Sequence, residues 1–175
     1  DVTKGSIKID GVDVRDYDLK ALRSKIGFIP QKTLLFTGTI GHNIKFGKKD
    51  ASHKELEHSA KIAQAYEFIS KKPNKFNEEI TEGGSNVSGG QKQRLSIARA
   101  IVRKPEIYIF DDSFSALDFK TDAILRSKLK EETKDSIVLV VAQRVSSILD
   151  ADKIIVLNEG EVVGEGTHKE LLKNC

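Results

Sequence analysis

The chain has no methionine, no tryptophan and only one cysteine among its 175 residues. Because a disulfide needs two cysteines, Cys175 cannot form one within the chain, and this scarcity fits a reducing compartment. A natural reading frame begins with methionine, so the lack of this residue leads us to expect a piece of a longer protein.

Long hydrophobic runs are missing as well. The longest, residues 137–142 (IVLVVA), is far shorter than the roughly 20 residues that a membrane-spanning helix needs. No signal-peptide pattern is present either. Any membrane attachment is therefore expected to come from outside these residues.

A strong charge of one sign is also absent. The formal net charge is +3, and the longest basic cluster, Lys71 and Lys72 near Lys75, has no aromatic residues interleaved with it. A nucleic-acid-binding surface usually shows a basic stripe, so the composition argues against that class of protein. Hydrophobic residues make up 38% of the chain, which is enough for a packed core.

The pattern that is present predicts an α/β protein. Strands are predicted at 6–10, 12–14, 26–29, 106–110, 136–142, 153–157 and 162–163, and helices at 18–22, 39–44, 52–69, 91–103, 120–132 and from Thr167, where Glu170 can complete a capping box. Strands that alternate with helices favour a parallel sheet, whereas the front of the chain reads as antiparallel β followed by a helical segment.

Two stretches between the predicted strands carry further local signals. Residues 81–90 (TEGGSNVSGG) contain four glycines and no periodicity, which indicates a loop. Within the predicted helix 52–69, small and apolar side chains at helical spacing predict a stripe that faces the core, formed by Leu56, Ala60, Ala63 and Ala65.

Two adjacent carboxylates end the apolar strand 107–110. In open α/β sheets ligands gather at the carboxyl ends of strands, and successive side chains of a strand point to opposite faces. One of Asp111 and Asp112 can therefore hold a Mg²⁺ ion through water while the other faces a reacting phosphate. A solvated acidic turn is the plainer interpretation of the same pair.

A serine and two glycines stand before a predicted helix. Ser88, Gly89 and Gly90 lead through Gln91 into this helix, whose N-terminus leaves backbone N–H groups aimed outward with partial positive charge. Because glycine lets the backbone approach closely, the segment predicts a phosphate site. Ser-Gly-Gly turns are common, so an ordinary capped turn is the alternative.

Two glutamines follow predicted strands. Gln31 comes after Pro30, which stops the strand 26–29, and Gln143 comes after the strand 136–142. Taken singly, each reads as a loop amide whose hydrogen bonds are satisfied locally.

The order of these motifs is more specific than any one of them. IGFIPQ, SGGQKQR, IYIFDD, SALD and VVAQR follow one another over residues 26–144, with LLFTGTIGHNIKFG (34–47) and GEGTHKELLK (164–173) beside them. Across essentially the whole chain, the sequence resembles the nucleotide-binding domain of export-type ATP-binding-cassette transporters. SGGQ upstream of a strand that ends in Asp-Asp is highly specific to that family.

The resemblance implies an α/β fold of the P-loop NTPase type, with a parallel sheet, flanking helices, a helical subdomain and remnants of an antiparallel β subdomain. It implies a β and core region at 1–30, a Q-loop and helical subdomain at 31–90, and a core with a C-terminal helix at 91–175. The implied ligands are ATP and Mg²⁺. The implied partners are a second nucleotide-binding domain and the transmembrane domains of a transporter, at the cytoplasmic face of the cell membrane, with no nucleic acid.

The same resemblance implies a role for individual residues. Gln31 matches the Q-loop glutamine, which senses Mg²⁺ and the attacking water, and Asp111 matches the Walker B aspartate that binds Mg²⁺. Asp118 ends the D-loop 115–118, which crosses the dimer interface. The signature motif, which grips the γ-phosphate bound to the opposite subunit, is matched by Ser88, Gly89, Gly90 and Gln91, with Val87 in place of the usual leucine.

One family motif is missing from the chain. No G-x-x-x-x-G-K-[ST] occurs, although in the family this loop cradles the phosphates and its lysine neutralises them. We expect this segment to lie upstream of Asp1, and we expect the present residues alone to bind ATP weakly.

Two catalytic positions also depart from the family. Asp112 stands where active members carry a glutamate. Its side chain is one methylene shorter, so its carboxylate falls about 1.5 Å short. A misplacement of about 1 Å can cost on the order of 100-fold in rate. Gln143 stands at the switch histidine, and an amide can donate one hydrogen bond but cannot become a cation. Impaired catalytic residues beside an intact signature motif resemble one half of a heterodimeric exporter.

Three alternatives remain open at this point. An active homodimeric exporter ATPase, in which Asp112 works slowly, is the first. A chromosome or DNA-repair ATPase would carry a long coiled coil between the Q-loop and the signature motif, and residues 32–87 contain no heptads. A non-catalytic regulatory module is the third.

Overall fold

A computed structural model describes residues 2–174, so Cys175 lies outside the described part of the chain. In chain order the elements are β1 (Lys8–Ile9), β2 (Val12–Asp13), the 3-10 helix η1 (Val14–Asp16), α1 (Leu19–Lys25), β3 (Ile26–Ile29), β4 (Gly38–Thr39), α2 (Ile40–Lys45), α3 (His53–Ile62), α4 (Tyr66–Ser70), η2 (Lys75–Asn77), β5 (Glu79–Ile80), η3 (Glu82–Gly84), α5 (Gly89–Ile101), β6 (Ile107–Asp111), α6 (Phe119–Glu132), β7 (Ile137–Val141), η4 (Val145–Ser147), β8 (Ile154–Asn158), β9 (Glu161–Gly166) and α7 (His168–Asn174).

Three parallel strands form the central sheet in the order β3-β6-β7. Ile29 lies opposite Phe110, and Phe110 lies opposite Val140, so the carboxyl ends of the three strands meet at one edge. Helix α5 lies in the connection from β3 to β6, and α6 connects β6 to β7. The predicted α/β fold with a parallel sheet is therefore confirmed.

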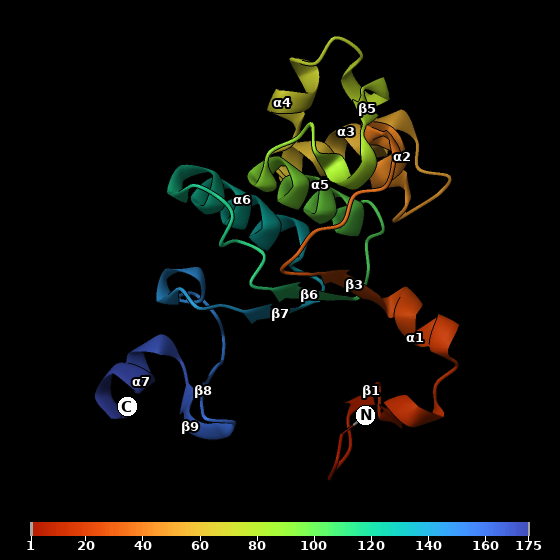
Figure 1. Ribbon diagram of the computed structural model, residues 1–175. Helices are drawn as coiled ribbons and strands as arrows, with labels where there is room; N and C mark the ends of the chain where they lie inside the picture. The colour runs from red at the N-terminus through yellow and green to blue at the C-terminus, as the bar shows by residue number, and fades with distance from the viewer. Residues whose placement is uncertain (1, 175) are drawn as a thin grey trace.

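Helices α2 to α6 gather on one side of this sheet. Helices α5 and α6 lie directly above it, α2 and α3 pack on α5, and α4 packs against α3 (Figure 1). The β1–β2 hairpin and the β8–β9 hairpin with α7 lie on the other side, apart from each other (Figure 1). Figure 1 also shows that the first and last parts of the chain flank the sheet rather than extend it.

The two faces of the sheet differ in burial because strand side chains alternate. Tyr108 and Phe110 of β6 are buried beneath the helices, at 2% and 1% exposure. On the opposite face Phe28, Ile137 and Leu139 are 55%, 66% and 54% exposed. Parallel sheets are normally covered on both faces, and residues 2–174 cover one of them.

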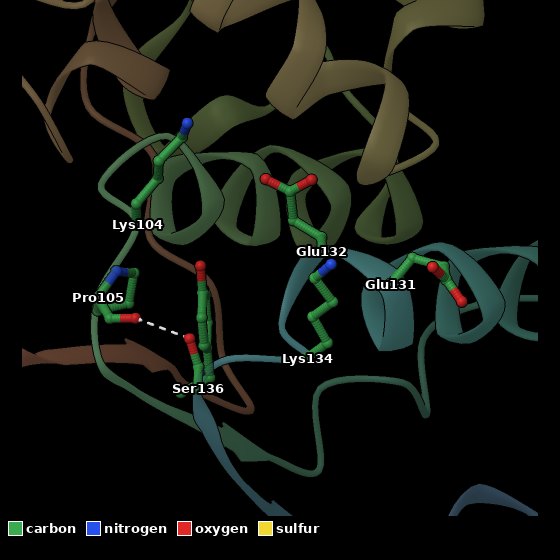
Figure 2. A pocket seen from close by; sticks show the side chains of 7 residues that line it. Lys104, Pro105, Glu131, Glu132, Lys134 and Ser136 are labelled. Carbon is green, nitrogen blue, oxygen red and sulfur yellow. Dashed lines mark hydrogen bonds between the residues drawn. The ribbon is translucent and has the colours of Figure 1, made fainter.

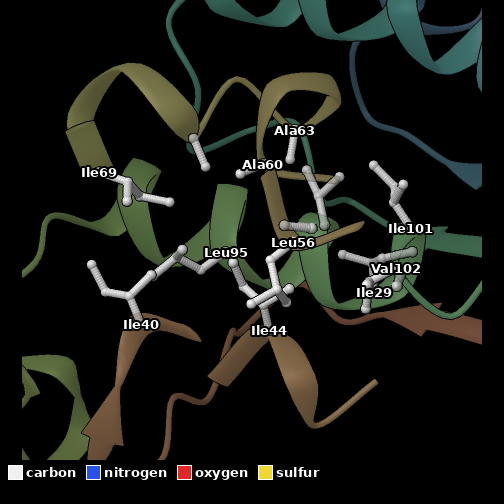
Figure 3. Close-up of a cluster of buried hydrophobic side chains, with 14 of the residues drawn as sticks. Ile29, Ile40, Ile44, Leu56, Ala60, Ala63, Ile69, Leu95, Ile101 and Val102 are labelled. Carbon is white, nitrogen blue, oxygen red and sulfur yellow. The ribbon is translucent and has the colours of Figure 1, made fainter. Parts of the chain in front are cut away.

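The hydrophobic core lies between the helices and continues down to the sheet. Ile40 and Ile44 of α2 and Leu56 of α3 pack around Leu95 of α5, and Ile29 joins them from β3 (Figure 3). These side chains are between 0% and 4% exposed, and full burial of each stabilises the fold by about 1.5–3 kcal/mol. The predicted core stripe of the helical segment is confirmed, since its four members, Leu56, Ala60, Ala63 and Ala65, are all buried.

The prediction of a single helix over 52–69 is wrong, because the segment forms two helices, α3 and α4. Gln64 takes the left-handed conformation with φ of 55°. The Ala65 N–H then donates to the Ala60 carbonyl at 2.7 Å, which closes the end of α3 in the manner of a Schellman motif. Glycine usually marks this position, and a glutamine there gave no signal in the sequence.

Several boundaries also differ from the predictions. Helix α5 begins at Gly89 rather than Gln91, and the predicted loop 81–90 contains η3, whose Gly83 carbonyl accepts from Lys92 Nζ at 2.7 Å. The two strands at the front are only two residues each, and the short β4–β5 pair was not predicted. The Thr167 capping box is present, with Glu170 Oε2 accepting from Thr167 N at 2.7 Å. Among the described helices, none is long and apolar enough to cross a bilayer.

Candidate functional site

Gln31 and Asp112 meet at the carboxyl edge of the sheet. Gln31 lies two residues after the end of β3, and Asp112 directly follows β6. Gln31 Nε2 donates a hydrogen bond to Asp112 Oδ2 at 3.0 Å. Because this bond uses the amide nitrogen, Gln31 Oε1 stays available as a ligand for a cation.

The backbone turns sharply between Asp111 and Asp112. Asp111 is the last residue of β6, whereas Asp112 leaves the strand with φ of 43°, in the left-handed region that aspartate tolerates better than most residues. Asp112 N donates to the Val141 carbonyl at 2.9 Å, and Ser115 Oγ donates to the Asp112 carbonyl at 2.9 Å. These bonds fix the turn on both sides, and they place the Asp112 carboxylate beside Gln31 rather than along the strand.

The N-terminus of α5 is capped by its own side chains. Ser88 Oγ accepts from Gln91 N at 3.2 Å, and Ser88 N donates to Gln91 Oε1 at 3.1 Å, which is a complete capping box. The amides of Gly89 and Gly90 find no acceptor within residues 2–174, and a Cβ added at Gly89 would meet no atom within 4 Å. This 13-residue helix thus offers two open N–H donors and its positive dipole end to an anion.

The segment 115–118 packs against this helix end. A Cβ added at Gly90 would lie 3.2 Å from the Ala116 carbonyl oxygen, so glycine lets the two backbones approach without crowding. Asp118 caps α6, because its carboxylate accepts from Thr121 N at 2.9 Å and from Thr121 Oγ1 at 2.7 Å. These two hydrogen bonds lower the pKa of Asp118 below its ordinary value.

Gln143 stands apart from the other predicted residues. It lies two residues beyond β7, is exposed, and forms no hydrogen bond with any residue that the structure describes. Its neighbour Arg144 instead donates to the Ser115 carbonyl at 3.1 Å and lies over the Phe119 ring at 5.4 Å. Arg144, which the sequence reasoning missed, therefore ties this segment to 115–118.

A buried amide on α5 was also missed. Gln93 is 2% exposed, accepts from Thr33 Oγ1 at 2.5 Å and donates to the Pro30 carbonyl at 3.2 Å. Its two partners, Pro30 and Thr33, lie on either side of Gln31 in the sequence. The available signal was its position on the helix face that also carries Ser96 and Ala100, where a polar residue needs a specific partner.

The donor set fits a magnesium ion held with a phosphate. In the part of the chain that the structure describes, no three His, Cys, Asp or Glu side chains cluster as a metal cage. Mg²⁺ keeps several waters and usually takes one or two carboxylates plus substrate phosphates. Asp111 and the free oxygen of Gln31 lie at the edge of the sheet where such a group would bind.

A pocket of about 300 Å³ lies at the opposite end of the strands (Figure 2). It is formed where β6 and β7 begin, and there Ser136 Oγ donates to the Pro105 carbonyl at 3.2 Å. Its lining residues are Lys104, Pro105, Tyr108, Glu131, Glu132, Lys134 and Ser136. Since open α/β sheets bind ligands at the carboxyl ends of their strands, this pocket is distinct from the candidate site.

Comparison with known families identifies the family of this chain. A family model described as ABC transporter matches residues 1–115. The chain belongs to the ABC transporter family. The resemblance drawn from the ordered motifs is therefore confirmed, and so is the fold expected from it.

Several ABC transporter proteins resemble the whole chain. An uncharacterized ABC transporter ATP-binding protein of Mycobacterium tuberculosis is 42% identical over 178 residues, which is 100% of this chain and 30% of that protein. The putative multidrug export ATP-binding/permease protein YgaD of Bacillus subtilis is 43% identical, over 98% of this chain and 30% of its own length. The chain thus spans less than a third of these relatives.

A solved ABC structure superposes on the chain closely. A bacterial Atm1-family ABC exporter with ATP bound matches with a TM-score of 0.95 and 38% identity, over 99% of this chain and 30% of the exporter chain. The arrangement of helices and strands in this chain is therefore shared with this ABC exporter. The roles of single residues stay predictions, which the geometry refines by joining Gln31 to Asp112 and leaving Gln143 apart.

Proposed function

We propose that this chain is the ATP-binding part of an ABC exporter, and that it binds Mg²⁺-ATP at an interface with a second nucleotide-binding domain. The observation that carries the proposal is the open N-terminus of α5, where the amides of Gly89 and Gly90 have no acceptor within residues 2–174. The names of the exporter relatives and the ATP-bound exporter that superposes on the chain support the same function.

The residues divide between two nucleotides in this proposal. Asp111 and Gln31 Oε1 hold the metal of the nucleotide on this chain. Ser88, through its hydroxyl, and the two glycine amides donate to the γ-phosphate of a nucleotide held by the partner domain. Bound Mg²⁺ neutralises charge on the phosphoryl group, and fixed N–H donors lower the barrier because they need no reorganisation.

The site on this chain is proposed to turn over slowly. The Asp112 carboxylate is one methylene shorter than the family's glutamate and is already engaged by Gln31 Nε2 at 3.0 Å. Gln143 makes no hydrogen bond that would hold it near Asp112 within the described residues. The capping box of Ser88 and Gln91 is complete, so the other composite site would be the competent one in a heterodimer.

The proposed setting is the cytoplasmic face of a membrane, reached through transmembrane domains. Closure of the two nucleotide-binding domains on ATP, and opening after hydrolysis, would move those domains between access states. The permease part named in the Bacillus relative supports this arrangement.

The test is ATP turnover by the full-length polypeptide, first alone and then with its candidate partner. We expect turnover only in the pair, lost in Ser88→Ala and retained in Asp112→Ala. Ser52→Ala is the matched control, because Ser52 caps α3 with the same kind of capping box and each cap contributes about 1 kcal/mol to stability. Turnover by the full-length polypeptide alone that is lost in Asp112→Ala would instead establish an active homodimer.

A further inference from the structure

Gln93 is a buried amide on α5 whose hydrogen-bond partners lie far away in the sequence. It projects from α5 into the core, is 2% exposed, and uses both ends of its amide. Oε1 accepts from Thr33 Oγ1 at 2.5 Å, and Nε2 donates to the Pro30 carbonyl at 3.2 Å. A buried side-chain amide is costly unless both ends are paired, so these bonds fix the positions of Pro30 and Thr33 relative to α5.

The two residues that are hydrogen-bonded to Gln93 flank Gln31 along the chain. Upstream, the Ile29 carbonyl is fixed to the sheet because Ser113 Oγ donates to it at 2.8 Å. Downstream, the Leu34 carbonyl is fixed to α5 because Arg99 donates to it at 3.1 Å. The segment that carries Gln31 therefore passes from the sheet to α5, and Gln93 fixes a residue of this segment on each side of Gln31.

The same helix carries the signature residues. Ser88 caps α5 and Gln93 lies five residues further on, which is about 7.5 Å along the helix axis. Because a hydrogen-bonded helix moves as a unit over such a distance, a displacement of Ser88 displaces the carbonyl of Pro30 and the hydroxyl of Thr33 with it. Gln31 then moves relative to Asp112, with which it shares the 3.0 Å hydrogen bond.

We propose that Gln93 is a positioning residue that links the two composite nucleotide sites of the dimer. When the signature turn closes on the partner's nucleotide, Gln93 brings Gln31 into its place at this chain's own nucleotide. The inference rests on the proposed function, because only in such a dimer do Ser88 and Gln31 serve different nucleotides.

Two substitutions separate this role from ordinary packing. Gln93→Met keeps the length of the side chain and removes both hydrogen bonds. Thr33→Val keeps the shape of Thr33 and removes its donor, while Thr33→Ser retains the donor. Ile97→Val is the control, because Ile97 is buried on the same helix and lies in its hydrophobic core, so the change removes packing alone.

The experiment combines ATP turnover with hydrogen exchange on the full-length transporter pair. In wild type, ATP should protect the peptides that cover 29–36 and 88–95 together. In Gln93→Met, the 88–95 peptide should still gain protection while 29–36 does not. The kcat of the pair should stay close to that of wild type, because the competent site uses the signature residues of this chain and not Gln31. Thr33→Val should match it, Thr33→Ser should resemble wild type, and the double variant should be no worse than Gln93→Met, since the two share one bond.

The outcomes separate this inference from the proposed function. A wild-type pair whose 88–95 peptide ignores ATP would refute the proposed function and the inference together. A wild-type pair that responds normally, with Gln93→Met indistinguishable from Ile97→Val in the protection of 29–36, would overturn the inference alone. A loss of protection in the double variant beyond that of Gln93→Met would likewise overturn it, because it would show that Thr33 and Gln93 act separately.

Discussion

At Asp112 the backbone and the side chain both favour aspartate. The φ of 43° places the residue in the left-handed region, where a longer side chain without local hydrogen bonding is strained. The carboxylate is at the right distance to accept from Gln31 Nε2 at 3.0 Å. The turn thus stabilises a residue that reaches less far than the glutamate to which the family resemblance points.

Asp112→Glu should therefore lower the stability of the protein and raise its ATP turnover. The added methylene moves the carboxylate outward by about 1.5 Å, and the left-handed backbone costs about 1 kcal/mol of the free energy of unfolding. We expect ATP turnover by the transporter pair to rise by up to about twofold, because a restored acid–base group lets this second composite site add its own turnover to that of the competent site. Turnover assays and denaturant unfolding measure the two effects. Asp112→Asn, which keeps the length and removes the charge, is the control, and a turnover no higher than wild type in Asp112→Glu would contradict the slow-site proposal.

Replacing Asn43 should destabilise the protein. It is fully buried, donates to the carbonyls of Phe36 and Thr39 at 2.8 and 3.1 Å, and accepts from Phe36 N and Arg99. Asn43→Ala strands these groups without partners, so we expect the free energy of unfolding to fall by about 3 kcal/mol. Denaturant unfolding measures the change.

The comparison for this prediction is Asn77→Ala. Asn77 is exposed and its side chain forms no hydrogen bond within the described residues, so its removal should change stability by less than about 0.5 kcal/mol. Equal losses in the two variants would mean that the Asn43 network contributes nothing specific.

Local chemistry explains which elements the sequence could predict. The capping box predicted at Thr167 depends on residues three positions apart, and it is present in the structure. The contact of Gln93 with Thr33 joins residues that are 60 positions apart, and no local pattern encodes such a distance. The break at Gln64 was missed for a third reason, since tertiary packing of α3 and α4 outweighs the preference of glutamine for a helix.

Helix α3 should be sensitive to acid through its capping box. The pKa of Glu55 is lowered to about 2, first by its hydrogen bond with Lys48 and then by its bonds with the amide and hydroxyl of Ser52. A carboxylate whose pKa is lowered in the folded state contributes stability that is present above its ordinary pKa of about 4.5. That contribution is lost as the pH falls from about 4.5 towards 2.

Glu55→Gln should remove this part of the acid sensitivity. Unfolding curves recorded between pH 5 and pH 2 should fall less steeply for the variant than for wild type, although the variant is less stable at neutral pH. Glu131→Gln removes an exposed carboxylate that forms no ion pair within residues 2–174, and it serves as the control. Identical pH profiles for Glu55→Gln and wild type would show that the ion pair with Lys48 contributes little in solution.

At the scale of the whole molecule, the described residues supply only part of the proposed nucleotide site. One face of the sheet is covered by α5 and α6, while the face with Phe28, Ile137 and Leu139 is more than half exposed. The chain also supplies Asp111 and Asp112 at the edge of the sheet without a G-x-x-x-x-G-K-[ST] loop, whose lysine would offset phosphate charge. Without such a lysine, the two carboxylates repel phosphate groups unless a cation is present.

The 175-residue chain by itself should therefore bind ATP only weakly. We expect a Kd above about 1 mM with Mg²⁺ present, which corresponds to a binding free energy weaker than about −4 kcal/mol. Isothermal titration calorimetry measures it, at low protein concentration because the exposed apolar face favours self-association. A longer polypeptide that carries a G-x-x-x-x-G-K-[ST] loop is the control, and it should bind far more tightly under the same conditions because the loop adds phosphate contacts. Saturable micromolar binding by the 175 residues, abolished by Asp111→Ala, would instead mean that the carboxyl edge of this sheet holds Mg²⁺-ATP without a phosphate loop.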